Sequence, residues 1–177
     1  MSYFYNYRVN GCEDKDTSHL FMRAILAYSD AFSLIYFKYR HEEELTEGVS
    51  KIKEKLAPFE LDSRYVTVWP GTKIINRRGN AYKMITYRID YDVIPILEEV
   101  NTLWDWDYPQ FPMDPCFYRK GRAWFAVSTH EHWNALYLKE DGNYPLVSDL
   151  ESLGVSLEYV NQVAEVELFY NQHYLWD

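Results

Sequence analysis

Residues 116–128 read CFYRKGRAWFAVS, so two apolar runs lie on either side of a short basic turn. The runs at 116–118 and 123–128 are rich in aromatic and small apolar residues, and Gly121 gives the turn a residue that tolerates positive φ. This pattern predicts an antiparallel β-hairpin. Residues 135–139 predict a third strand after it.

A similar pattern lies upstream, where residues 73–76 and 81–89 predict a hairpin around the turn RRGN at 77–80. Residues 65–69 (YVTVW) also predict a strand, which ends at a Pro-Gly pair. Residues 31–38 are short, aromatic and apolar, which favours a strand buried on at least one face.

Helices are predicted where apolar residues recur at helical spacing. The predicted helices are residues 18–29, residues 42–56 with Leu45, Val49, Ile52 and Leu56 on one face, residues 92–104, residues 145–153 and residues 156–170. The last segment is ambiguous, because residues 165–169 alternate like a strand. Residues 105–115 contain three prolines and are predicted to form an ordered loop.

Hairpins interspersed with helices predict an α+β fold. Because the regular βαβ alternation of a parallel sheet is missing, we expect a largely antiparallel sheet of hairpins with helices packed mainly on one face. The chain has 177 residues, 47% of them hydrophobic. We therefore expect a single domain over residues 1–177.

The net charge of the chain disfavours some classes of binding partner. Eighteen basic and 27 acidic residues leave a net charge of -9, which disfavours general binding to nucleic-acid backbones or anionic lipids. No apolar run is long enough for a membrane span, and the first residues lack a signal-peptide pattern. Cys12 and Cys116 lie far apart, so we expect neither a disulfide nor a thiolate zinc site, and a cytoplasmic location.

The second hairpin belongs to a longer pattern. Residues 116–131 (CFYRKGRAWFAVSTHE) are followed by a Leu-Tyr-Leu strand and a helix that contains SDLE at 148–151. Within residues 116–153 this pattern resembles small uncharacterised bacterial cytosolic proteins. The resemblance implies a bacterial or phage origin and carries no activity with it.

Two surfaces are candidates for binding. The first combines flat aromatic rings with carboxylates suited to basic partners, and consists of Trp104, Asp105, Trp106, Asp107 and Tyr108. The alternative is that these tryptophans fill the core. The second is an anion-binding patch formed by the two basic turns, Arg77 and Arg78 with Arg119, Lys120 and Arg122. Its alternative is that the turn charges only aid solubility.

One cluster suggests chemistry. His130 and His132 alternate in sequence, so in an extended segment both imidazoles point to one side and can share a metal if the loop at 105–114 adds a carboxylate. Cys116 with His130 is a possible nucleophile and base. In the competing interpretation, His130 and His132 are solvated and Cys116 is a buried structural residue. We predict no bound metal and no cofactor.

The sequence lacks phosphate-binding glycine loops, a nucleophile elbow and a His-Glu-x-x-His helix. The leading hypothesis is therefore a non-catalytic, cytosolic protein-binding module of bacterial or phage origin, for example an immunity-type protein that neutralises a basic toxin. The alternative hypothesis is a small enzyme or ligand-binding domain centred on Cys116, His130 and His132.

Overall fold

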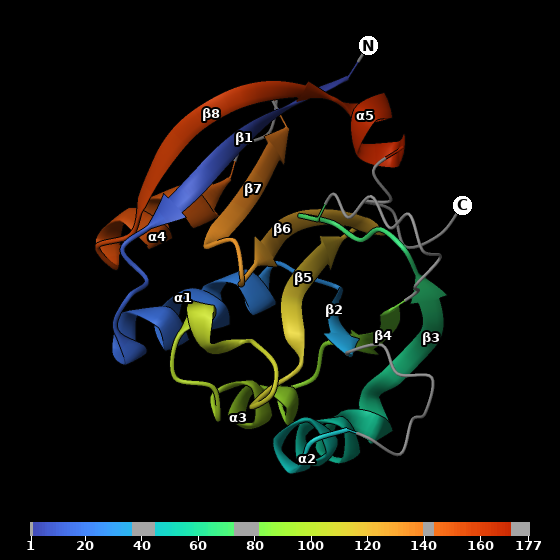
Figure 1. Cartoon of the computed structure of the whole chain (residues 1–177). Coiled ribbons are helices and arrows are strands. Elements are labelled where there is room, and N and C mark those ends of the chain that lie inside the picture. The colour runs from blue at the N-terminus through green and yellow to red at the C-terminus, as the bar shows by residue number, and fades with distance from the viewer. Residues whose placement is uncertain (1, 37–44, 73–81, 140–143, 171–177) are drawn as a thin grey trace.

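A computed structural model describes residues 2–36, 45–72, 82–139 and 144–170. The strands in these residues form one eight-stranded antiparallel sheet in the order β3-β4-β2-β5-β6-β7-β1-β8 (Figure 1). The strands are β1 (Tyr3–Asn10), β2 (Ala31–Tyr36), β3 (Glu60–Val66), β4 (Tyr82–Arg88), β5 (Met113–Arg119), β6 (Arg122–Ser128), β7 (Trp133–Lys139) and β8 (Ser156–Ala164).

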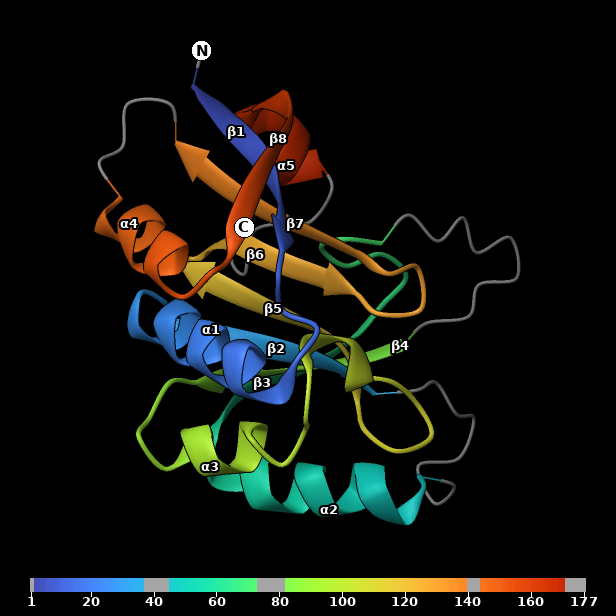
Figure 2. The ribbon, with the colours of Figure 1, turned by 90° about the vertical axis from the view of Figure 1, so that its left-hand side faces the viewer.

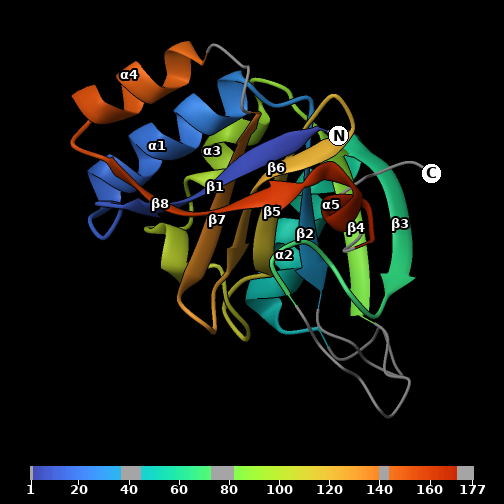
Figure 3. The same ribbon diagram turned by 90° about the horizontal axis from the view of Figure 1, so that it is seen from above.

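Four helices cover one face of this sheet, with α1 and α4 side by side (Figures 2 and 3). These are α1 (Lys15–Ala27), α2 (Glu47–Leu56), α3 (Val93–Leu97) and α4 (Pro145–Ser152). The fifth helix, α5 (Glu165–Tyr170), lies on the other face, where Leu168 packs with Phe4 and Tyr137. The α+β prediction, with an antiparallel sheet and helices mainly on one face, is confirmed.

The hairpin at residues 116–128 is also confirmed, as β5 and β6. Arg119 pairs with Arg122, and the two residues between them, Lys120 and Gly121, both have positive φ, at 52° and 74°. Such a pair matches the right-handed twist of the strands. Residues 73–76 and the turn at 77–80 lie outside the described residues, while β4 matches the predicted second arm of that hairpin.

The sequence of helix α2 stabilises both of its ends. The Thr46 hydroxyl accepts the Val49 N–H at the N-terminus, and Lys53 and Lys55 lie in the last turn, where they complement the helix dipole. Val49, Ile52 and Leu56 are buried, as their spacing predicts. Leu45 is only half-buried and precedes the helix.

Gly48 in α2 makes a close contact that helix propensity ignores. A Cβ atom on Gly48 would lie 2.2 Å from the backbone oxygen of Gln110. Propensity alone favours alanine over glycine by about 1 kcal/mol. We nevertheless expect Gly48→Ala to lower the free energy of unfolding by about 1–3 kcal/mol, because the backbone must move apart. Urea denaturation measures this, with the exposed Lys51→Ala as control, and a gain in stability for Gly48→Ala would refute the close contact.

Several sequence predictions need correction. Residues 156–164 form β8 and not a helix, because the chain pairs there with β1, a strand that the sequence analysis did not predict. Only residues 165–170 are helical. The strand predicted at 65–69 lies at 60–66, since β3 follows the register of β4.

The segment at 92–115 also differs from the prediction. Helix α3 ends at Leu97, and Leu103–Asp105 form a separate 3₁₀ turn, so the predicted helix to Trp104 is wrong. The predicted loop ends earlier, because β5 begins at Met113 and includes the last three residues of the proline-containing stretch, Met113, Asp114 and Pro115. In the described part of the chain, no helix has both the length and the apolar character that a bilayer span requires.

Candidate functional site

The Trp104–Tyr108 segment packs inward at its centre. Trp106 is 1% exposed within the main core, and its ring lies 6.2 Å from that of Phe111. The Asp105 carboxylate accepts hydrogen bonds from the backbone N–H and the hydroxyl of Thr102. Trp106 therefore fills the core, which is the alternative that the sequence left open. Exposed surface in this segment remains only on the residues beside Trp106.

The Cys116, His130 and His132 side chains do not converge. Cys116 is 1% exposed between strands, and this burial raises the pKa of its thiol well above the ordinary value. His130 Nδ1 lies 3.9 Å from Asp114, whereas the His132 ring lies against Trp104 with centroids 5.2 Å apart. Within the described ranges, no group of three or more His, Cys, Asp or Glu side chains is placed to hold a metal ion.

The predicted anion-binding patch lies only partly within the described residues. Arg77 and Arg78 lie outside the described residues. The Arg119 guanidinium lies 5.8 Å from each of the rings of Tyr28 and Tyr144, which belong to the helix-side core.

Arg122 instead lies 3.9 Å from the ring centroid of Phe4, which belongs to a cluster on the opposite face. The Lys120 backbone N–H donates to the Asp30 carboxylate. The two arginines of this turn are thus engaged by aromatic rings of different clusters, which does not favour a shared anion site.

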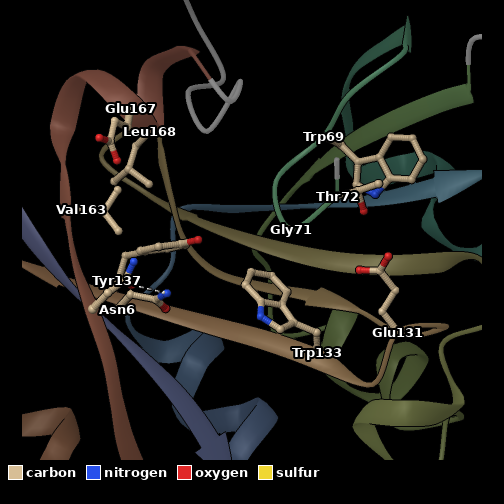
Figure 4. A pocket seen from close by; sticks show the side chains of 11 residues that line it. Asn6, Trp69, Gly71, Thr72, Glu131, Trp133, Tyr137, Val163, Glu167 and Leu168 are labelled. Carbon is tan, nitrogen blue, oxygen red and sulfur yellow. Dashed lines mark hydrogen bonds between the residues drawn. The ribbon is translucent and has the colours of Figure 1, made fainter. Parts of the chain in front are cut away.

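A groove that the sequence analysis missed lies on the face opposite α1–α4 (Figure 4). It has a volume of about 500 Å³, within the size range of small-ligand pockets. The lining side chains come from β1, the segment after β3, the β6–β7 turn, β7, β8 and α5. They are Asn6, Trp69, Thr72, Glu131, Trp133, Tyr137, Asn161, Val163, Glu167 and Leu168, with the backbone of Gly71.

Among the aromatic side chains that line the groove, Trp133 is half-buried, whereas Trp69 is only 2% exposed. The Trp69 ring lies 5.0 Å from the ring of Tyr82, and Trp69 and Thr72 form an isolated β-bridge. Between them Gly71 has a φ of +87°, and a Cβ atom there would lie 3.1 Å from the Trp133 ring. A glycine is thus required both for the turn and for the approach of this loop to Trp133.

The charged side chains that line the groove are both acidic. Glu131 comes from the β6–β7 turn and Glu167 from α5, and no Lys or Arg is among the described residues that line it. The Asn6 amide donates to Asn161 at 3.0 Å. Asn6 is 8% exposed, and its Oδ1 is buried without a hydrogen-bond partner among the described residues.

Asp114 fixes the position of the Trp69–Thr72 segment through hydrogen bonds. Its carboxylate is buried and accepts hydrogen bonds from Trp69 Nε1–H at 3.0 Å, from the Thr129 N–H at 2.9 Å and from the Thr72 hydroxyl at 3.5 Å. Burial raises the pKa of Asp114, while the hydrogen bonds and nearby His130 act in the opposite direction. These contacts join two of the groove-lining residues to strand β5 and to the turn that follows β6.

Comparison of the chain with protein-family models, with curated proteins and with solved structures gives no match. The chemistry of the groove is therefore argued from its residues. Aromatic faces attract cations, and carboxylates pair with them, most strongly where water is partly excluded. The arrangement is suited to holding a positively charged group.

Proposed function

We propose that this protein is a non-catalytic binding module that recognises a basic partner through the groove. The carrying observation is the combination of the half-buried ring of Trp133 with two carboxylates, Glu131 and Glu167, and no Lys or Arg among the described lining residues. The net charge of -9 supports the proposal, since it speeds the encounter with a basic partner.

The proposed partner is a basic protein, as the sequence predicts, but the proposed contact surface is the groove and not the Trp104–Tyr108 segment. The Trp104–Tyr108 segment loses its central aromatic anchor to the core, because Trp106 is buried. An immunity-type protein that neutralises a basic toxin is the form of this function that we favour. A bacterial cytoplasm is part of the same proposal, and the two free cysteines fit a reducing compartment.

The test uses a lysine- and arginine-rich peptide as the probe and an acidic peptide of equal length as its counterpart. We expect the basic peptide alone to bind, and the Glu131→Gln/Glu167→Gln double variant to bind it roughly tenfold more weakly, because two attractive charges are removed. Isothermal titration calorimetry at two salt concentrations measures both effects.

The matched control is Glu13→Gln/Glu151→Gln, which removes two exposed carboxylates that do not line the groove. It has the same net charge as the groove variant and should bind the basic peptide almost as well as the original protein. Equal weakening in the two double variants would show that only overall charge matters, and the groove would lose its role. Tighter binding of the acidic peptide would overturn the proposal entirely.

A further inference from the structure

The two carboxylates of the groove stand apart. Glu131 is carried by the β6–β7 turn, beside the Trp69–Thr72 loop, whereas Glu167 is carried by α5, beside Val163 and Leu168 (Figure 4). A single ammonium or guanidinium group therefore does not meet both carboxylates at once. The groove offers two separate places for positive charge.

Aromatic side chains lie in the space between the two carboxylates. Figure 4 shows Trp133 and Tyr137 between Glu131 and Glu167, with Val163 on the side of α5. Such a surface packs against methylene groups and also attracts a nearby cation through the ring faces. A flexible alkyl chain fits this middle section better than a further charge does.

The Asn6–Asn161 pair adds an observation that is independent of the acidic residues. Asn6 is mostly buried, it lines the groove, and its Oδ1 lacks a hydrogen-bond partner in the described part of the chain. Buried polar atoms in native proteins are nearly always satisfied, by protein, water or ligand. A small rotation of this amide would present an acceptor to an ammonium N–H in the groove.

We propose that the groove binds a linear dication, in which two ammonium groups are joined by an unbranched alkyl chain. One ammonium group pairs with Glu131 and the other with Glu167, while the chain lies across Trp133 and Tyr137. This inference rests on the proposed function, since both place positive charge in the same groove. Two sources carry this chemistry, a free diamine or polyamine and a pair of lysine side chains on one segment of the partner.

The test is calorimetric titration with a series of unbranched diaminoalkanes of increasing length, each matched with the monoamine of equal length. We expect one length to bind best and to bind about tenfold more tightly than its monoamine, because the second ion pair adds to the first. Glu131→Gln and Glu167→Gln, each made separately, should reduce the diamine to the affinity of the monoamine. Glu151→Gln is the control and should leave both affinities unchanged.

Competition then separates the two sources. If a peptide with two lysines displaces the best diamine, the dication belongs to a partner segment. If the peptide does not displace it, the ligand is a free amine. Both results support the inference. Equal affinity of diamine and monoamine at every length would overturn it. The proposed function would still stand if the basic peptide bound and its binding depended on Glu131 and Glu167. If the basic peptide also failed to bind in this way, both the proposed function and the inference would be wrong.

Discussion

Replacing Trp106 by alanine is expected to lower the free energy of unfolding by about 3–5 kcal/mol, the usual cost of deleting a buried aromatic side chain. Trp106 is 1% exposed and belongs to the main core between the sheet and the helices. Removing its indole leaves a cavity that the neighbouring side chains fill only in part. Urea denaturation with fluorescence or circular dichroism detection measures the change.

The control is Tyr91→Ala, since Tyr91 is 89% exposed. Its replacement should alter the free energy of unfolding by no more than about 0.5 kcal/mol. A Trp106 variant that unfolds with nearly the original free energy but binds the basic peptide more weakly would return this side chain to a surface role. It would also restore the Trp104–Tyr108 segment as the main contact surface.

The second large effect is expected for Asp114→Ala, which should lower the free energy of unfolding by about 2–4 kcal/mol. The substitution leaves Trp69 Nε1–H and the Thr129 N–H without their acceptor in a buried site. It also loosens the Trp69–Thr72 segment that carries Gly71, so binding of the basic peptide should weaken even though Asp114 is not among the residues that line the groove. Denaturation and calorimetry on the same sample measure the two effects.

The pH dependence of Asp114→Asn tests the cause of the raised pKa. A folded-state pKa above the unfolded value means that the folded protein holds the proton more tightly, so this stabilising contribution is present at low pH and is lost as the pH rises through the raised pKa. His130 Nδ1 lies 3.9 Å from the Asp114 carboxylate and acts on its pKa through its charge. The comparison is therefore repeated in the His130→Ala background.

We expect the stability of the original protein relative to Asp114→Asn to fall as the pH rises from below about 4, the ordinary value for a free aspartate. A relative stability that rises over the same range would show that the hydrogen bonds from Trp69, Thr72 and Thr129 outweigh burial. The pKa of Asp114 would then be lowered and not raised.

Local patterns explain which parts of the fold were predictable. The β5–β6 hairpin follows from two apolar runs and a turn with Gly121, all within one short stretch. The strand β8 depends instead on β1, at the other end of the chain, where Asn6 pairs with Asn161. Residues 156–164 satisfy a helical pattern as well, so only this distant pairing decides their structure.

The groove was unpredictable for the same reason. Trp69, Glu131, Trp133 and Glu167 come from three separate regions of the chain and share no motif. The sequence analysis did single out the turn that carries Glu131, but for its two histidines. Aromatic residues make up 18% of the chain, but this content does not locate a site, because most of the large aromatic side chains that are fully buried serve the core.

The most direct test of the central claim, that the groove receives a basic group, is to follow the indole N–H signals by NMR during titration with the basic peptide. The signal of Trp133, which is half-buried, should shift in a saturable way, and those of the fully buried Trp106 and Trp124 should stay in place. In the Glu131→Gln/Glu167→Gln variant, the shift at Trp133 should need a higher peptide concentration. An unchanged signal for Trp133 while the peptide binds elsewhere would contradict the claim.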